Sequence, residues 1–260
     1  MAGKKRVQLE FLGTGTSSGL PVPGCRCRVC KSADPHDSRM RSSVVVRNGR
    51  RNIVIDTGPE FRLQCLRADL DNVDAVVFTH GHVDHTSGFD DIRAFSFFKN
   101  RTVPVFGDAG TLRTLRERFR YIWRARQRGG GLPQIELFEI DGPFAAAGLE
   151  MIPIPVFHGV MPILGFRIGD LAYLTDVSGI PDASLPLLEN LGALIVSCAR
   201  TRPHETHFNL ADVKRLSRAL KPGRTLVTHI AHYFSHRDLV AALPAAANPA
   251  YDGLRVDIEV

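Results

Sequence analysis

The chain has 260 residues, of which 44% are hydrophobic and 23% are charged. This length and balance allow a large hydrophobic core and exclude an intrinsically disordered protein. The formal net charge of +6 suits either an anionic partner or a mildly basic solvated surface. Five cysteines are too few for a disulfide-stabilised secreted protein of this length.

The first residues do not have the pattern of a signal peptide. Gln8 and Glu10 interrupt the apolar run that such a segment needs. No stretch of the sequence is apolar over the length of a membrane-spanning helix. We therefore expect a soluble, cytoplasmic protein that does not contact a membrane.

Short apolar runs rich in β-branched residues recur along the chain, each bounded by glycine, proline, aspartate or polar residues. Runs of this kind predict β-strands. They cover residues 7–13, 42–49, 52–58, 74–80, 103–107, 149–159, 171–176, 193–198 and 224–229. The first run alternates like a half-buried strand, whereas DAVVF and ALIVS are typical of strands buried on both faces.

Two segments between these runs have helical character. Residues 209–220 carry apolar side chains at helical spacing, with Asn209 as N-cap and Pro222 with Gly223 as the stop. Residues 110–131 form a second candidate helix. Strands interspersed with helices predict an α/β (α+β) fold in which helices cover β-sheets. Because no linker or repeat interrupts the sequence, we expect a single domain over residues 1–260.

Residues 113–128 are strongly basic, with seven arginines and one acidic residue, Glu117. We favour an amphipathic surface helix with a solvated basic face. A lid or docking arm over an anionic substrate is the alternative, and the glycines at 129–131 would give it a mobile tip.

Three of the five cysteines crowd into the segment PGCRCRVCK at residues 23–31. Such crowding suits a disulfide framework, a reactive thiol or a metal site. The odd cysteine count and the expected reducing compartment disfavour disulfides. Three thiolates leave one position open on a tetrahedral zinc ion, and THIAHYFSH offers a free histidine. The cysteine-rich loop at 24–31 thus predicts a structural zinc site of Cys25, Cys27, Cys30 and His232.

The strongest signal is the segment VVFTHGHVDHTSG, which places four metal-capable side chains directly after an apolar run: His80, His82, Asp84 and His85. Three more follow apolar runs further along the chain: His158, Asp176 and His229. Imidazole and carboxylate suit zinc, manganese and iron(II). Because strand ends can converge on one cleft, we predict that these seven side chains form one metal centre.

Seven candidate ligands are too many for one catalytic metal and suit two, with a carboxylate between them. Two such ions, Mn²⁺ or Zn²⁺, can share a hydroxide that attacks phosphorus. Asp56 follows the run NIVI in the same way. It could be a ligand, but we favour a hydrogen-bond acceptor that orients a ligand histidine. Because these ligands can activate water and the sequence has no P-loop, metal-activated hydrolysis is the expected chemistry.

The segment THGHVDH and the order of the downstream ligands resemble the metallo-β-lactamase superfamily. The likeness extends from FLGTGTSSG at 11–19 to LVTHIAH at 226–232. It implies an αββα sandwich of two mixed β-sheets flanked by helices. It also implies that one metal is held by His80, His82 and His158, the other by Asp84, His85 and His229, with Asp176 bridging.

His207 lies just before the predicted helix at 209–220. A histidine near the cleft can protonate a leaving alkoxide or stabilise charge on phosphoryl oxygens. The phosphodiesterase branch of the superfamily has a histidine in a similar position. We therefore assign His207, together with Asp84, as candidate catalytic residues, with His204 as the weaker alternative to His207.

The segments CRCRVC and HIAH resemble the phosphodiesterase family of the carbon–phosphorus lyase pathway, which hydrolyses phosphoribosyl 1,2-cyclic phosphate during phosphonate degradation. The resemblance implies a small anionic cyclic phosphodiester as substrate, manganese or zinc as the catalytic metal, and a homodimer. In this interpretation the bridging hydroxide attacks phosphorus in line and a ribose oxygen leaves.

Other functions on the same ligands stay open. A transfer-RNA 3′-processing endonuclease would use residues 113–128 to bind nucleic acid, although nothing here resembles a dedicated RNA-binding arm. A glyoxalase II-like thiolesterase could use the same metal residues. A non-enzymatic protein could also retain the metal-stabilised scaffold.

Overall fold

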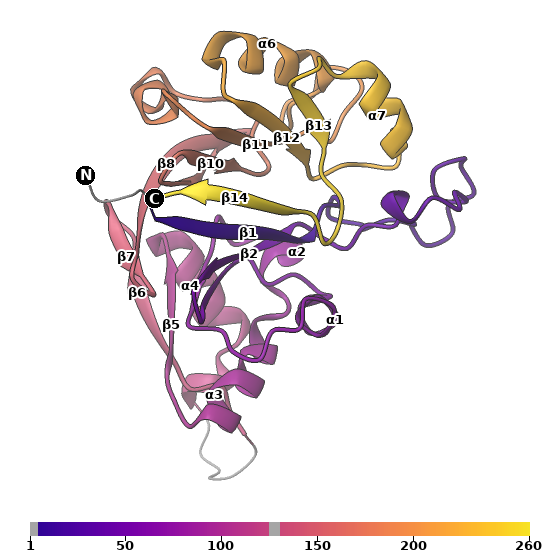
Figure 1. Ribbon diagram of the computed structural model, residues 1–260. Coiled ribbons are helices and arrows are strands. Elements are labelled where there is room, and N and C mark those ends of the chain that lie inside the picture. Colours follow the sequence, from indigo (N-terminus) through magenta and orange to yellow (C-terminus); the bar gives the residue numbers. More distant parts are fainter. Residues whose placement is uncertain (1–4, 125–130) are drawn as a thin grey trace.

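The computed structural model describes residues 5–124 and 131–260. Two seven-stranded mixed sheets pack face to face, and helices cover both outer faces (Figure 1). The strand order is β14-β1-β2-β3-β4-β5-β6 in the first sheet and β13-β12-β11-β10-β9-β8-β7 in the second. This arrangement confirms the predicted αββα fold class.

The strands of the first sheet are β1 (Arg6–Gly13), β2 (Ser43–Asn48), β3 (Arg51–Ile55), β4 (Ala75–Val77), β5 (Val103–Gly107), β6 (Ile135–Glu139) and β14 (Arg255–Glu259). Those of the second are β7 (Phe144–Ala146), β8 (Leu149–His158), β9 (Met161–Ile168), β10 (Leu171–Leu174), β11 (Ala193–Ser197), β12 (Arg224–Thr228) and β13 (Ala247–Pro249). Strands β3 to β6 run parallel to one another, as do β10 to β13.

The helices of the described residues are α1 (Phe61–Arg67), α2 (Val83–Thr86), α3 (Arg93–Lys99), α4 (Ala109–Arg118), α5 (Tyr121–Arg124), α6 (Leu210–Leu220) and α7 (His236–Ala242). Three short 3₁₀ helices join them: η1 (Pro35–Asp37), η2 (Phe89–Ile92) and η3 (Asp182–Leu188). In Figure 1, α6 and α7 lie beyond the second sheet and α1, α3 and α4 beyond the first.

Alternation along the strands builds three apolar layers. Ile53 and Ile55 face the core between the sheets, whereas Val54 faces the layer under α1 and α4. Likewise Ile195 faces the central core, and its neighbours in β11 face the layer under α6 and α7. Strands buried on both faces read as continuous apolar runs, which is why AVVF and ALIVS are apolar throughout.

The structure departs from the predicted elements in two places. Strand β1 was expected to be buried on one face only, but both of its faces are largely covered. On its outer face Glu10 lies under Arg47 and Arg255, which both pair with its carboxylate. The predicted helix at 110–131 is interrupted after α4, since Phe119 leaves helical geometry to bury its ring beside Phe89. The glycines at 129 and 130 lie outside the described residues.

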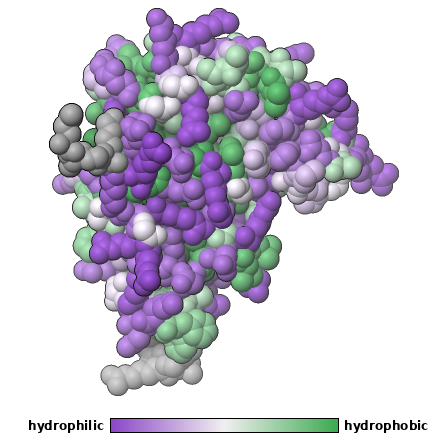
Figure 2. All heavy atoms as spheres, in the orientation of Figure 1, coloured by the Kyte–Doolittle hydropathy of each residue, from purple (hydrophilic) through white to green (hydrophobic). Residues whose placement is uncertain are grey.

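The surface seen in Figure 2 is largely hydrophilic, and apolar atoms gather over α3 at the lower tip. Two phenylalanines there are exposed, Phe97 by 59% and Phe98 by 81%. In the described part of the chain, no helix combines the length and the apolar character required to cross a membrane.

Candidate metal centre

The predicted ligands lie where strands end. Asp56 and His229 directly follow β3 and β12, Asp176 follows β10 after Thr175, and His158 is the last residue of β8. The loop after β4 supplies His80 and His82, and helix α2 supplies Asp84 and His85. Because the parallel strands of each sheet end at the same edge, all seven predicted ligands meet there, with Asp56 behind them.

Asp176 lies at the middle of this cluster. Its Oδ2 is 3.1 Å from Nε2 of His85, and its Oδ1 is 3.0 Å from Nε2 of His229. Asp84 reaches the same two imidazoles, with Oδ2 at 3.4 Å from His85 Nε2 and 3.8 Å from His229 Nε2. Two carboxylates thus face two buried imidazoles, which is a suitable ligand set for a divalent cation.

The other imidazoles extend the cluster. The ring centroid of His82 lies 4.6 Å from that of His80 and 5.1 Å from that of His158. The ring of His158 in turn lies 4.7 Å from that of His207, which places His207 beside the predicted ligands.

Three histidines are oriented by acceptors on their Nδ1 atoms. His85 Nδ1 donates to Asp56 Oδ2 at 2.7 Å, and His158 Nδ1 donates to the Thr206 carbonyl at 2.7 Å. Thr79 Oγ1 donates to Asp56 at 2.8 Å and lies 3.0 Å from His80 Nδ1. Since Nδ1–H is engaged in each ring, Nε2 carries the free lone pair and is available to a metal.

Several buried nitrogens of this cluster have no hydrogen-bond partner among the described residues. They are Nε2 of His80, Nε2 of His85, Nδ1 of His207, and both ring nitrogens of His229. A buried polar atom without a partner is costly. Metal ions would satisfy these atoms, so the donor set fits the divalent metals that the sequence predicts.

The charges of the cluster reinforce one another. Burial alone would raise the pKa of Asp176, but the neighbouring His229 and His85 hold it well below its usual value. Burial likewise opposes the charged form of His85, yet Asp56 and Asp176 raise its pKa well above the ordinary value. The carboxylates therefore favour positive charge at this position, which a bound divalent cation would supply.

Both catalytic candidates and the alternative lie close to this centre. His207 Nδ1 is 3.6 Å from Asp176 Oδ1, and the pKa of His207 is lowered to about 3 by burial and by His229. It groups with His158 and Asp176 in a set whose ligand atoms lie within 4.8 Å of one another, so it also has the position of a ligand. His204 is exposed, and its ring centroid is 5.9 Å from that of His207.

Sequence reasoning missed the threonines that precede the strand-end ligands. Thr79 supports both Asp56 and His80, as described above, and Thr175 Oγ1 donates to Asp176 Oδ2 at 2.8 Å. Both threonines are buried, and so is Thr228 before His229. The repeated signal in FTH, LTD and VTH, one hydroxyl between an apolar strand and a ligand, was present in the sequence.

Residues 125–128 of the basic segment 113–128 lie outside the described part of the chain. Within the described part, Arg118 is exposed to solvent and also contacts the segment that carries the ligands. Arg118 Nη1 donates to the Gly81 carbonyl at 3.3 Å and also to Thr86 Oγ1. It therefore braces the loop that carries His80 to His85.

The cysteine-rich loop meets its predicted histidine. Nδ1 of His232 lies 3.3 Å from Sγ of Cys25, 3.7 Å from that of Cys27 and 3.6 Å from that of Cys30. A tetrahedral zinc ion with ordinary Zn–S and Zn–N bonds puts sulfur and nitrogen about 3.6 Å apart. The four atoms therefore have the spacing of a structural zinc site, which we call the Cys₃His cluster.

Cavities open on two sides of the centre. A large one of about 750 Å³ lies beside His80 and His82, between α4 and the hairpin of β8 and β9, and most of its wall is apolar. A smaller one of about 130 Å³ lies beside His207 and His229. The metal centre therefore lies between a large apolar cavity and a small polar one.

Comparison with known families decides the family. The model of the beta-lactamase superfamily domain matches residues 51–230, which include all seven predicted ligands. The chain belongs to the beta-lactamase superfamily. This beta-lactamase superfamily protein is 40% identical to a protein whose crystal structure is described as a new diphosphatase from the PhnP family. The two superpose with a TM-score of 0.93, and 98% of each chain is covered.

The beta-lactamase superfamily fold is also shared with human short-form tRNase Z, at 17% identity and a TM-score of 0.70, covering 97% of this chain and 100% of that one. An octanoyltransferase of Porphyromonas gingivalis is 35% identical over 254 residues, which is 96% of this chain and 51% of that protein. The chain thus spans about half the length of this curated relative.

Proposed function

We propose that the protein is a metal-dependent phosphodiesterase that hydrolyses a small cyclic phosphodiester of the phosphoribosyl 1,2-cyclic phosphate type. The family and the PhnP-family relative support the broader assignment, a metal-dependent hydrolase. The observation that carries the proposal is the set of buried, unpartnered imidazole nitrogens that face the carboxylates of Asp84 and Asp176.

We propose two ligand sets around a shared carboxylate: His80, His82 and His158; Asp84, His85 and His229; with Asp176 common to both. Divalent metals held there, Mn²⁺ or Zn²⁺, would supply activated water and offset negative charge at phosphorus. The chain itself supplies orientation, because Asp56, Thr79 and the Thr206 carbonyl fix the ligand rings.

His207 is the proposed catalytic histidine. Its lowered pKa keeps the imidazole neutral near pH 7, so its role is to donate a hydrogen bond from its remaining N–H to a phosphoryl oxygen or the leaving oxygen. This sharpens the two roles considered from the sequence, because a neutral imidazole has no extra proton to give to the leaving group.

The test compares His207→Ala with His204→Ala on manganese- and zinc-loaded enzyme. The panel contains ribosyl 1,2-cyclic, 2′,3′-cyclic and linear phosphodiesters. We expect His207→Ala to keep its metals and lose about 10²- to 10³-fold in kcat, as for loss of one hydrogen-bond donor to a developing charge, and the exposed His204→Ala to match the wild type. Loss of a metal ion from His207→Ala would make His207 a ligand instead, and undiminished turnover would remove it from the reaction.

A second candidate is hydrolysis of a diphosphate bond, favoured by the 40% identity to the PhnP-family diphosphatase. The panel therefore includes a nucleoside diphosphate ester and inorganic pyrophosphate. A kcat/KM for a diphosphate above that for every cyclic diester would decide for this candidate.

Two activities on thioesters are tested as well. An octanoyl thioester tests the activity named for the octanoyltransferase relative, and lactoylglutathione tests the thiolesterase alternative. The transferase name belongs to a protein of about twice this length, and we expect no turnover of either thioester. The tRNase Z likeness is one of fold, so we expect no cleavage of precursor transfer RNA. The homodimer, the single domain and the cytoplasmic location stay predictions.

A further inference from the structure

The small cavity of about 130 Å³ beside the metal centre has a polar wall without a carboxylate. The residues that line it include Ser17, Ser18, Arg200, His229, His232 and Tyr233. One wall is thus shared with the metal centre through His229, and another with the Cys₃His cluster through His232. A cavity of this size holds a tetrahedral anion or a few water molecules.

Arg200 is the one cation of permanent charge in this wall. Its Nε is buried and has no hydrogen-bond partner among the described residues. Its Nη1 donates weakly to Tyr233 Oη at 3.4 Å, and its guanidinium carbon lies 6.0 Å from the centre of the Tyr233 ring. The described residues place no carboxylate in ion-pair contact with it. A partly buried guanidinium with unused donors is poised to receive an anion.

The backbone holds Arg200 in place independently of its side chain. Its carbonyl accepts from the Leu210 amide at 3.3 Å, at the start of α6, and the residue bridges to Asn209. The loop that carries Ser17 and Ser18 also lines the cavity, and it is anchored beside the metal centre, because Ile230 N donates to the Thr14 carbonyl at 2.8 Å. Arg200 and the two serines therefore line one cavity from two anchored segments.

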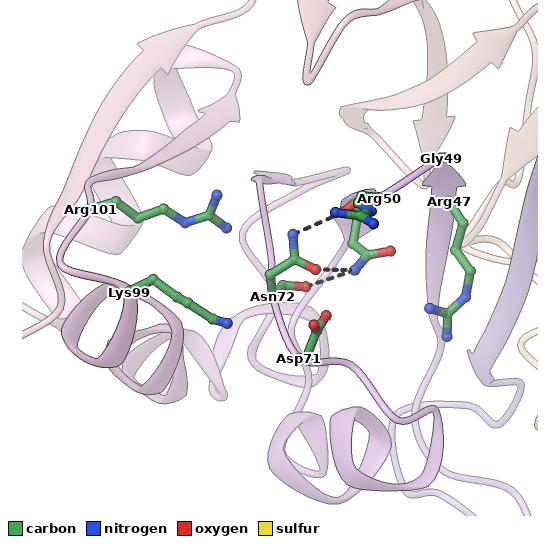
Figure 3. A pocket seen from close by; sticks show the side chains of 8 residues that line it. Arg47, Gly49, Arg50, Asp71, Asn72, Lys99 and Arg101 are labelled. Carbon is green, nitrogen blue, oxygen red and sulfur yellow. Dashed lines mark hydrogen bonds between the residues drawn. The ribbon is translucent and has the colours of Figure 1, made fainter.

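A second basic cavity shows by contrast why Arg200 stands out. It lies at the far edge of the first sheet, where β3, β4 and β5 begin (Figure 3). Of its four cations, Arg50 and Lys99 are exposed to solvent. The two half-buried ones are paired, Arg47 with Glu10 at 2.8 Å and Arg101 with Asp74 at 2.7 Å. The half-buried arginines of that cavity are thus balanced by carboxylates, whereas Arg200 is not.

We propose that the cavity around Arg200 binds a second anionic group of the substrate, a phosphate monoester, in addition to the phosphate that is cleaved. This proposal rests on the proposed function and specifies its substrate class. Arg200 acts as a positioning residue: a bidentate contact to a phosphate oxygen pair fixes one arm of the substrate, while Ser17 and Ser18 offer further donors.

The test compares Arg200→Met with Arg202→Met, an exposed arginine two residues along the same loop. The substrates are ribosyl 1,2-cyclic phosphate with and without a 5-phosphate. For the phosphorylated substrate we expect Arg200→Met to raise KM about 10- to 100-fold, as expected for loss of a charged hydrogen bond, with kcat little changed. The substrate without the 5-phosphate should be unaffected, Arg202→Met should match the wild type, and Arg200→Lys should recover part of the loss. An equal loss on both substrates, or a loss in kcat alone, would overturn the proposal.

Binding of ribose 5-phosphate, which has no diester bond to cleave, separates this proposal from the proposed function. Calorimetry on the metal-loaded protein should show binding to the wild type and to Arg202→Met, and at least tenfold weaker binding to Arg200→Met. If the wild type cleaves no diester but shows this pattern, the anion site stands and the phosphodiesterase assignment fails. If it cleaves diesters and Arg200→Met binds ribose 5-phosphate equally well, the reverse holds.

Discussion

Three residues of the metal centre have an unusual backbone conformation. Asp56, Asp176 and His229 have φ angles of 64°, 53° and 51°. The left-handed region costs a non-glycine residue on the order of 1–3 kcal/mol and recurs at functional sites. Here this conformation turns each side chain from the end of its strand toward the metal centre. The backbone conformation thus costs local stability but positions the three side chains.

At the same scale, we predict that Asp56→Asn weakens metal binding. The Asp56 carboxylate accepts from the Thr79 amide, the Thr79 hydroxyl and His85 Nδ1. An amide in its place turns an NH₂ group toward one of these donors, so His85 loses its orientation. We expect metal affinity to fall about 10- to 100-fold, measured by competition with a chelator.

The exposed Asp141→Asn is the matched control for Asp56→Asn and should bind metal like the wild type. Equal affinities of the two variants would mean that Asp56 does not orient the site.

Residue identities in the centre were predictable because the ligands share one placement, the end of an apolar run. The positive φ angles were not, since glycine is the residue that normally signals them. Arg200 was also missed. Nothing in the segment ARTRP distinguishes it from Arg202, and the difference lies in the neighbours that folding brings to it.

At the scale of elements, helix α6 and its N-cap Asn209 were predictable from the sequence. The same N-cap lies beside the metal centre. Asn209 accepts from Ala211 and Asp212 amides, and Asp212 accepts in return from the Asn209 amide, which completes a capping box. His207 lies two residues earlier, and the Phe208 amide donates to the Val177 carbonyl at 2.7 Å. The start of this helix therefore positions the proposed catalytic histidine.

We predict that Asn209→Ala lowers both stability and activity. Loss of the cap costs about 1 kcal/mol, which corresponds to a fall in Tm of about 2–4 °C for a chain of this size. Because the cap also holds the segment that carries His207, kcat should fall as well.

Ser235→Ala removes the equivalent cap from α7 and is the control for Asn209→Ala. It should lower Tm without lowering kcat. If kcat falls equally in both variants, the effect is one of general stability and not of His207.

Elements that lack their own apolar rhythm were not predictable. Strands β6, β7, β13 and β14 form the sheet edges and are only three to five residues long, which is too short for a secure periodic signal. Strand β9 inside the second sheet was also not predicted. The interruption after α4 has a tertiary cause, since the burial of Phe119 against Phe89 outweighs the helical spacing that continues to Trp123.

For the whole molecule, the Cys₃His cluster joins the N-terminal loop to the segment after β12. We predict about three metal ions per chain in the wild type, two in the centre and one in this cluster. Cys27→Ser should bind one fewer and unfold at a lower temperature, because metal bound by the folded state alone stabilises that state. Metal analysis and thermal unfolding measure the two effects.

Cys65→Ser is the matched control for Cys27→Ser, since Cys65 is on the buried face of α1 and lies outside the cluster. It should lower the Tm by placing a hydroxyl in an apolar site, yet keep the full metal content. A wild type with about two metal ions, and a Cys27→Ser variant equal to it, would remove the zinc from this cluster.

The same cluster sets an order on biosynthesis. Cys25 and His232 are 207 positions apart, and at about 5–20 residues per second a ribosome needs about 10–40 s to make the chain between them. During that interval the three cysteines lack His232, the histidine that completes their site in the folded chain. We therefore expect the site to take up its zinc only after His232 has been made.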